Sequence, residues 1–281
     1  MNCIIDIGGG ASKSVFADGV FDFLMDQGIR FDSCIGVSAG AANCCSYVSG
    51  QRGRNLNFYT QYNLEPRAIG LPAFIRTRGS WIDLDYIYGT LSNSDGKCPL
   101  DYEAFAASDM KATLVVTDAL TAEPVYFDKS DVKKDDYWII CASSANPEFC
   151  KAYMHDRHPY FDGYVSDPIP VERALAAGCD KIVVLLPFPK DHLRSGKRDA
   201  KAAAKLAKKY PAVSAKLAGY SQRYNRQLKR ALELEKEGVC LIVSPEHFSD
   251  MKPMEKDRNK IFAFHQAGYE RASMIQSFLD T

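Results

Sequence analysis

The sequence predicts an α/β fold whose central sheet is mostly parallel. Two observations come from the apolar pattern: strand and helix patterns alternate over residues 3–50, and a further helix–strand pair follows over residues 167–186. A third observation is the composition. Of the 281 residues, 46% are hydrophobic, which excludes a disordered chain and suffices for a large core. Strands joined by a helix form βαβ units, whose strands run parallel with a right-handed crossover.

The first βαβ unit begins at the N-terminus. Cys3–Ile7 is a short apolar run typical of a buried strand, and Gly8–Gly10 close it. A helix with apolar residues at helical spacing follows and ends at Gly28. The second strand, Ser33–Ile35, leads into Gly36–Gly40 and a helix of small residues. The apolar positions of the first helix are Phe16, Val20, Phe23 and Leu24.

The middle of the chain predicts a hairpin and a second helix–strand pair. Thr113–Thr117 is a β-branched run, and Val125–Phe127 is its expected hairpin partner after a turn. Asp167–Pro168 is a typical N-cap and first-turn pair, which predicts a helix through Ala177. The strand Lys181–Leu186 follows.

From Lys190 the composition shifts toward lysine, arginine and alanine. Two charged amphipathic helices are expected over residues 191–237, then a strand at 239–243 and a last helix over 258–279. Phosphate binding is one interpretation of the lysine-rich helix faces, but the interspersed glutamates favour solvated surface. We therefore expect a core, residues 1–190, and a mainly helical C-terminal extension, residues 191–281, packed on it.

Charge and cysteine content narrow the function classes. Lysine plus arginine and aspartate plus glutamate both number 35, so no nucleic acid partner is expected. The N-terminus has no basic region or cleavage site, and no apolar run approaches the roughly 20 residues of a membrane span, so neither a signal peptide nor a span is expected. The nine cysteines lack paired spacing, which predicts free thiols in a cytoplasmic protein. Those inside apolar runs are Cys3, Cys34, Cys141, Cys179 and Cys240.

The sharpest chemical signal is the segment Gly36-Val37-Ser38-Ala39-Gly40, between a predicted strand and a predicted helix. Gly36 and Gly40 allow a strained turn, a nucleophile elbow, that exposes the Ser38 hydroxyl. The helix behind the turn adds unpaired N–H groups and a partial positive charge. Ser38 is therefore the candidate nucleophile, and an ordinary tight turn is the plainer alternative.

The glycine loop Gly8–Gly10 is expected to face Ser38, because the carboxyl ends of neighbouring parallel strands lie side by side. Backbone N–H groups of such a loop approach an oxyanion closely, and we place the oxyanion hole at Gly9, Gly10 and Ala11. Nucleotide binding is excluded, because Lys13 occupies the last glycine position of the dinucleotide pattern and no Gly-Lys-Ser/Thr follows. No cofactor is expected.

Asp162 is the candidate proton acceptor. It ends an apolar stretch immediately before Gly163, where a carboxylate can take the serine proton directly. Asp167, five residues on, is better explained as a helix cap.

These features, in this order, resemble the patatin-like phospholipase family. The resemblance rests on the glycine loop, Ser38 in its elbow, Asp162-Gly163 and the segment Cys141–Pro147 ahead of the aspartate, and it covers about residues 3–190. The rest of the chain is similar to the C-terminal extension of certain bacterial members. The resemblance implies a three-layer α/β/α fold and a Ser–Asp dyad without histidine. It also implies hydrolysis of lipid acyl esters through an acyl-enzyme, as in a phospholipase A or lysophospholipase.

The sequence departs from the family pattern in two places. If Lys13 occupies the family's basic position, Ala11 and Ser14 replace glycines, and a positive φ at either would cost ~1–2 kcal/mol. Alternatively, the loop is shifted by one residue onto Gly8–Gly10. Tyr164 is bulky where the family has a small residue. These departures leave a second interpretation open, a catalytically weak or inactive lipid-binding homologue.

Other chemistries are less well supported. A Ser-His-Asp carboxylesterase would place its histidine after the acid, an order satisfied without a recognisable motif by His192, His247 and His265. His155 and His158 lack the spacing of a metal site, so no metal is expected. Transfer of the acyl group to another alcohol uses the same chemistry as hydrolysis and stays open.

Residues 69–88 are the candidate surface for membrane contact. A lipid hydrolase must reach acyl chains in an aggregate, so an apolar surface near Ser38 is expected. This segment carries Leu71, Phe74, Ile75, Trp81, Ile82 and Tyr86, and the arginines alongside it are Arg67, Arg76 and Arg78. Since the net charge is zero, the expected contact is peripheral and reversible. The alternative is that the aromatic residues pack inward as a cover of the core.

Overall fold

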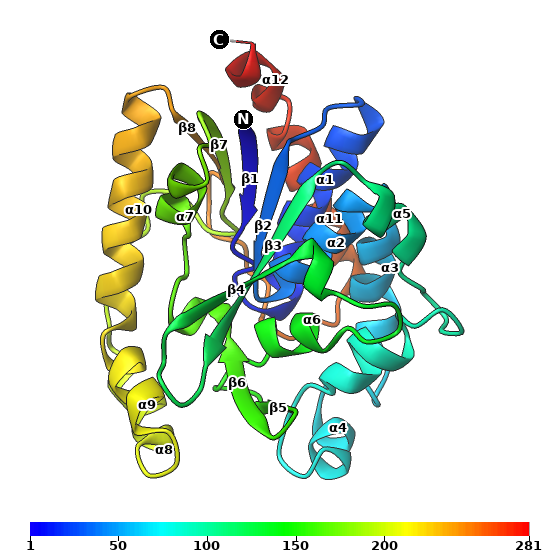
Figure 1. The fold of residues 1–281 in the computed structure, drawn as a ribbon, viewed down its shortest axis with the longest axis vertical. Coiled ribbons are helices and arrows are strands. Elements are labelled where there is room, and N and C mark those ends of the chain that lie inside the picture. Colours follow the sequence, from blue (N-terminus) through cyan, green and yellow to red (C-terminus); the bar gives the residue numbers. More distant parts are fainter. Residues whose placement is uncertain (281) are drawn as a thin grey trace.

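A mixed eight-stranded sheet forms the centre of the molecule, and helices cover both of its faces (Figure 1). The computed structural model describes residues 1–280. The strand order is β5-β6-β3-β2-β1-β7-β8, and β4 also pairs with β3. The strands are β1 Asn2–Asp6, β2 Ser33–Val37, β3 Lys111–Asp118, β4 Pro124–Asp128, β5 Tyr153–His155, β6 His158–Asp162, β7 Lys181–Leu185 and β8 Cys240–Val243.

The five strands from β3 to β8 in this order run parallel, and β4, β5 and β6 are antiparallel additions. The predicted mostly parallel sheet and the β3–β4 hairpin are thus confirmed. In residues 1–280, no helix combines the length and apolar character needed to cross a membrane.

The helices surround this sheet in two layers. They are α1 Val15–Asp26, α2 Ala39–Val48, α3 Arg54–Thr60, α4 Leu71–Arg76, α5 Tyr102–Ala107, α6 Trp138–Ser143, α7 Val171–Ala176, α8 Asp199–Leu206, α9 Pro211–Ala218, α10 Tyr220–Lys236, α11 Arg258–Arg271 and α12 Met274–Leu279. The short 3-10 helices are η1 Ala11–Ser14, η2 Tyr62–Leu64, η4 Lys129–Asp131 and η5 Gly163–Val165, and Asp85–Thr90 forms a π-helix.

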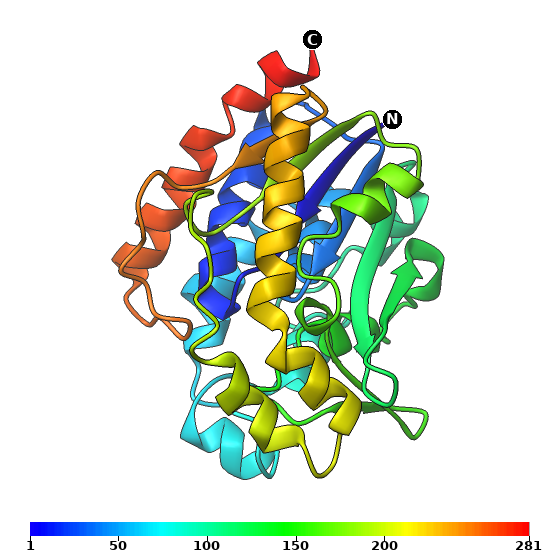
Figure 2. The ribbon, with the colours of Figure 1, turned by 90° about the vertical axis from the view of Figure 1, so that its left-hand side faces the viewer.

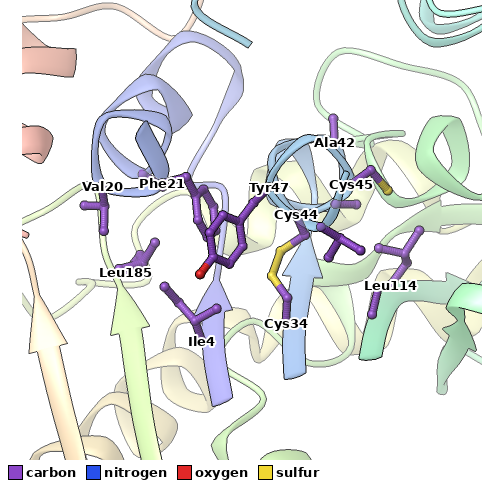
Figure 3. Packing of buried hydrophobic residues seen from close by; sticks show 14 of the residues in the cluster. Ile4, Val20, Phe21, Cys34, Ala42, Cys44, Cys45, Tyr47, Leu114 and Leu185 are labelled. Carbon is purple, nitrogen blue, oxygen red and sulfur yellow. A yellow bond between two sulfur atoms is a disulfide. The ribbon is translucent and has the colours of Figure 1, made fainter. Parts of the chain in front are cut away.

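Successive residues of a strand point to opposite faces, so a sheet buried on both sides has strands that are apolar throughout. Ile4 of β1 belongs to the core under α1, α2 and α11, and Cys3 and Ile5 belong to the core under α7 and α10. Figure 2 shows α10 on one side of the sheet and α11 on the other. In the first core, Phe21 of α1 and Tyr47 of α2 stack with ring centroids 4.8 Å apart (Figure 3). The expected three-layer α/β/α fold is confirmed.

The C-terminal region is part of both layers and of the sheet. Its β8 pairs with β7, while α10 covers one face and α11 the other. Three helices, α8 to α10, fill the span where two were expected, because Pro211 starts α9 and the non-helical Gly219 separates α9 from α10. The expected final helix is divided into α11 and α12.

The helix predicted from Asp167–Pro168 begins later, at Val171. The residue before a proline avoids the helical conformation, which keeps Ile169 out of the helix ahead of Pro170. Asp167 is therefore not an N-cap, and that prediction was wrong. Its carboxylate accepts hydrogen bonds from the hydroxyl of Tyr126 and the amide of Gln227, both at 2.6 Å.

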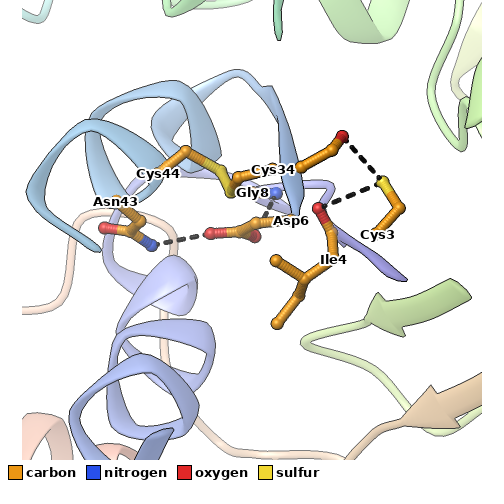
Figure 4. The surroundings of a disulfide bond; sticks show 8 residues. Cys3, Ile4, Asp6, Gly8, Cys34, Asn43 and Cys44 are labelled. Atoms are coloured by element: carbon orange, nitrogen blue, oxygen red, sulfur yellow. Dashed lines mark hydrogen bonds between the residues drawn. A yellow bond between two sulfur atoms is a disulfide. The ribbon is translucent and has the colours of Figure 1, made fainter. Parts of the chain in front are cut away.

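One cysteine pair also differs from expectation. Cys34 on β2 and Cys44 on α2 form a disulfide, so the prediction of a free thiol at Cys34 was wrong (Figure 4). The pairing joins a strand to the helix that follows it, which spacing alone does not indicate. The other seven cysteines are free and buried.

Candidate active site

The turn from β2 to α2 holds Ser38 in a strained conformation. Its φ of 60° and ψ of −137° lie where residues with a Cβ are rarely found. A Cβ at Gly36 would lie 2.6 Å from the Ala41 Cα, and one at Gly40 would lie 2.3 Å from the Asp6 carbonyl oxygen. Both glycines are thus required by close backbone contact, as the elbow pattern predicted.

Ser38 and Asp162 lie together at the carboxyl edge of the sheet. Val37 of β2 pairs with Val115 of β3, and Asp162 at the end of β6 pairs with Val116. Only β3 therefore separates the two candidate residues, and the Ser38 Oγ donates a 2.7 Å hydrogen bond to Asp162 Oδ2.

The Asp162 carboxylate is fully buried. Burial raises its pKa to about 7, while hydrogen bonds from the Ser38 hydroxyl and the Tyr164 N–H oppose the rise. The Tyr164 N–H donates to Oδ1 at 3.1 Å, so the bulky side chain of Tyr164 does not prevent this backbone contact. A carboxylate with a pKa near neutrality is suited to accept and return a proton.

Ser143 is a positioning residue that the sequence analysis did not single out. The Ser38 N–H donates to the Ser143 Oγ at 3.0 Å, and the Ser143 hydroxyl donates to the Val115 carbonyl at 2.8 Å. The strained backbone of Ser38 is thereby tied to β3. The signal in the sequence was the family-like segment Cys141–Pro147, in which no individual role was assigned.

The glycine loop lies beside Ser38, and the Asp6 carboxylate holds it in place through a hydrogen bond. Gly8, Gly9 and Gly10 have φ values of 69°, 94° and 101°, a region that favours glycine. The Gly8 N–H donates to Asp6 Oδ1 at 2.8 Å, and Asn43 donates to Asp6 Oδ2 at the same distance (Figure 4). Burial raises the pKa of Asp6 to about 7.

The glycine loop presents free donors to a cavity. Within residues 1–280, the N–H groups of Gly9 and Gly10 have no hydrogen-bond acceptor, and both residues line the cavity together with Ser38. Ala11, the third residue predicted for the oxyanion hole, also has an N–H without an acceptor within residues 1–280, while its side chain packs beside the apolar cluster around Ile82. Ala11 has a φ of 44°, the positive value expected there in the register anchored on Lys13, whereas Ser14 is right-handed helical, so only one of the two replaced glycine positions has a positive φ.

The cavity has a volume of about 510 Å³ and reaches from Ser38 to the C-terminal helices. Its apolar wall includes Ile7, Phe149, Phe188, Leu193 and Leu217. Its basic residues, Lys13, His192, Arg194, Lys197 and Arg198, outnumber the acidic ones, Glu148 and Asp199. An apolar wall with cationic groups suits a ligand that has both an acyl chain and a negative charge.

Arg194 is the most firmly placed of these cations. Its guanidinium lies over the rings of Tyr224, Tyr220 and Phe188, at 4.4, 5.1 and 5.3 Å from their centroids. Nowhere in the described part of the chain does a carboxylate lie within 4.0 Å of this guanidinium. Lys13 also contacts Phe188, and burial, together with the Arg194 charge, lowers the pKa of Lys13. We call Lys13, Arg194, Lys197 and Arg198 the cationic wall; within residues 1–280, none of the four forms an ion pair with a carboxylate.

The candidate histidines do not join Ser38 and Asp162. His192 lines the cavity but packs against Phe248, with ring centroids 4.6 Å apart. His247 is exposed, and His265 lies in a different layer beside Asp22. Because Ser38 donates directly to Asp162, no imidazole stands between the two groups.

Comparison with known protein families gives two matches. A family model described as "Patatin-like phospholipase" matches residues 7–175, which contain both Ser38 and Asp162. A second model, described as "Domain of unknown function (DUF6363)", matches residues 210–276. Arg194 lies between the two matched ranges.

Individual proteins are also similar to this chain. It is 29% identical over 186 residues to the "Uncharacterized protein YjjU" of Escherichia coli strain K12. That match covers 64% of this chain and 50% of YjjU, so the chain spans about half the length of this relative. Among solved structures, VipD from Legionella pneumophila aligns at a TM-score of 0.46 and 10% identity, over 98% of this chain and 66% of VipD.

Proposed function

The chain belongs to the patatin-like phospholipase family, and on that premise we propose that it is a serine hydrolase that cleaves lipid acyl esters with Ser38 and Asp162. The observation that carries the proposal is the 2.7 Å hydrogen bond from the strained Ser38 to the buried Asp162, at the edge of a cavity. An exposed hydroxyl, an adjacent base and nearby free N–H groups are the parts that acyl transfer requires.

The proposed reaction has two matching halves. Asp162 takes the hydroxyl proton as Ser38 Oγ attacks the ester carbonyl, and the N–H groups of Gly9 and Gly10 stabilise the oxyanion. The carboxylic acid then returns its proton to the departing alcohol, which leaves an acyl-enzyme. Water repeats the sequence, with Asp162 accepting its proton, and frees the fatty acid and Ser38.

Turnover of a short-chain nitrophenyl ester tests this proposal, with Ser38→Ala as the comparison. We expect hydrolysis by the wild-type protein and only background release by the variant, because the alanine has no nucleophilic oxygen. A folded wild-type protein without turnover would favour the inactive lipid-binding homologue instead.

The esterase activity is expected to fall on the acid side of about pH 7. Protonation of Asp162, whose pKa is raised to about 7 by burial, removes the proton acceptor, so kcat/KM should decrease as the pH falls through that value. Asp6 titrates in the same range beside the glycine loop. Asp6→Asn is therefore the control, and its kcat/KM should still decrease as the pH falls below about 7. A wild-type kcat/KM that does not change from about pH 5 to 8 would contradict the role of Asp162.

The cationic wall favours an ester whose alcohol part carries a phosphate. Arg194→Met should lower kcat/KM for a lysophospholipid by roughly 10- to 100-fold, since a hydrogen bond to a charged group contributes about 1.5–3 kcal/mol. Hydrolysis of a neutral monoacylglycerol should stay within about twofold. The control is Lys201→Met, which removes an exposed positive charge outside the cavity lining. Equal losses on both substrates would remove the phosphate preference from the proposal.

Part of the segment 69–88 is exposed near the cavity. Leu71 and Ile75 of α4 are 59% and 69% exposed, whereas Ile69, Ile82 and Tyr86 are buried. The neighbouring Trp81 is 39% exposed, and its backbone N–H donates to the backbone carbonyl of Phe149, a cavity residue. Ile82 and Tyr86 thus pack inward, whereas Leu71 and Ile75 are accessible, and we propose that α4 makes the peripheral membrane contact.

Leu71→Ser combined with Ile75→Ser should reduce turnover on phospholipid vesicles at least about tenfold, because burying one such side chain contributes about 1.5–3 kcal/mol. Turnover of the soluble short-chain ester should not change. Phe262→Ser, at a 48% exposed position on α11, is the matched control. A parallel loss on the soluble ester would show that α4 acts through the fold rather than through the membrane.

A further inference from the structure

Helices α1 and α11 approach each other unusually closely. A Cβ at Gly19 of α1 would lie 1.9 Å from the carbonyl oxygen of His265, and one at Gly268 of α11 would lie 1.9 Å from that of Phe16. The two backbones are thus in direct contact, and the side chains beside these glycines are pressed together away from water.

Three potential metal ligands meet at this contact: Asp18 and Asp22, one turn apart on α1, and His265 on α11. All three are buried, at 1%, 0% and 7% exposure. His265 Nε2 lies 3.1 Å from Asp22 Oδ2 and 3.6 Å from Asp18 Oδ2, and the three donor atoms all lie within 4.8 Å of one another. We call these residues the α1–α11 cluster.

One ligand atom of the cluster has no other partner. Asp18 Oδ2 is buried and accepts no hydrogen bond from any group in residues 1–280. A buried carboxylate oxygen without a donor is costly, which points to a cation at this position.

The outer oxygen of the Asp22 carboxylate is held by a neutral donor. The Gly53 N–H donates to Asp22 Oδ1 at 2.9 Å, while Oδ2 of the same carboxylate faces His265. Such contacts orient carboxylates around metal ions. The nearby Arg52 does not neutralise the cluster directly, because its guanidinium pairs with Asp26 at the surface.

We propose that the α1–α11 cluster binds a divalent transition-metal ion, of which Zn²⁺ is the best fit. Bonds of about 2.0–2.2 Å in a tetrahedral site place neighbouring ligand atoms about 3.4 Å apart, and the distances of 3.1 and 3.6 Å from His265 bracket that value. An imidazole nitrogen beside two carboxylates favours such metals over Mg²⁺ and Ca²⁺, which prefer oxygen ligands. A water molecule completes the fourth position.

The ion would join the C-terminal region to the helix that follows the glycine loop. Asp18 and Asp22 lie on α1, which η1 connects to Gly10, while His265 comes from the last long helix. The proposed role is therefore structural, and it does not depend on the proposed hydrolase activity.

The test is metal reconstitution of the full-length protein after removal of any affinity tag. Wild type is stripped with a chelator and reloaded with Zn²⁺; the zinc content is measured after excess metal is removed, and the Tm is measured both with free Zn²⁺ present and without metal. We expect about one Zn²⁺ per chain, and a Tm higher by about 5–10 °C at a zinc concentration about a hundredfold above Kd. Asp18→Asn should lose both responses, and Asp26→Asn, on the exposed face of the same helix, should keep them.

The Tm of the metal-free wild type and of the metal-free Asp18→Asn variant distinguishes a metal site from an ion pair. If His265 served only as a cationic partner of the two carboxylates, Asp18→Asn would lower the Tm of the stripped protein. If the cluster is a metal site, the stripped variant should be at least as stable as stripped wild type, because one uncompensated buried charge is removed. Zinc binding that is absent from wild type, or equal in wild type and Asp18→Asn, would overturn the proposal.

Discussion

Asp162→Asn is expected to fold normally and to lose esterase turnover by about a factor of 10²–10⁴, the usual contribution of a general base. The asparagine can still accept the hydrogen bond that the Ser38 hydroxyl donates at 2.7 Å. It cannot take the proton at neutral pH, so attack on the ester would require a poorly nucleophilic hydroxyl. The measurement is kcat for a soluble nitrophenyl ester, together with the thermal unfolding curve of the variant.

Asp167→Asn is the matched control for this prediction. Asp167 is a neighbouring buried carboxylate that accepts hydrogen bonds from Tyr126 and Gln227 and does not contact Ser38. Its replacement should leave kcat within a few-fold of wild type even if it lowers the Tm. Near-wild-type turnover in Asp162→Asn would refute the role of Asp162 as proton acceptor.

Gly8→Ala is expected to lower kcat by about 10²–10³, the effect of losing one oxyanion donor. The new Cβ would lie 2.7 Å from the Val37 carbonyl oxygen and 3.0 Å from the Ser38 Cβ, so the glycine loop and the elbow must separate. That movement shifts the N–H groups of Gly9 and Gly10 relative to the carbonyl under attack.

Gly28→Ala separates this effect from backbone strain alone. Gly28 has nearly the same φ, 67° against 69°, but a Cβ there would meet no atom within 4 Å. Both variants should lose ~1–2 kcal/mol of stability from the positive φ, and only Gly8→Ala should lose turnover. Undiminished kcat in Gly8→Ala would show that the glycine loop does not form the oxyanion hole.

Local patterns predicted the parts of this protein that depend on close backbone contact. Gly36 and Gly40 identified the turn at Ser38 because no larger residue fits at either position. The strand pattern placed Ser38 and the glycine loop at the same sheet edge, since parallel strands end together. Asp162 was found as a carboxylate in an apolar stretch, and the structure shows it fully buried.

Features that depend on contacts between distant segments were not predicted. Arg194 looked like ordinary charged surface in the sequence, and only the fold places it over Tyr220 and Tyr224 at the cavity. His265 was considered only as a catalytic residue, because a sequence separation of 243 residues from Asp22 conceals their proximity. Asp167 was wrongly predicted as an N-cap, because the Asp-Pro pattern alone does not show that Pro170 moves the start of the helix to Val171.

Labelling with a fluorophosphonate probe tests the central claim most directly, because the probe reacts with an activated serine whatever the natural substrate is. We predict one label per wild-type chain, located at Ser38 by peptide mass spectrometry. Labelling should be absent in Ser38→Ala and strongly slowed in Asp162→Asn. A folded wild-type protein that is not labelled, or a label that persists in Ser38→Ala, would contradict the assignment of Ser38 as the nucleophile.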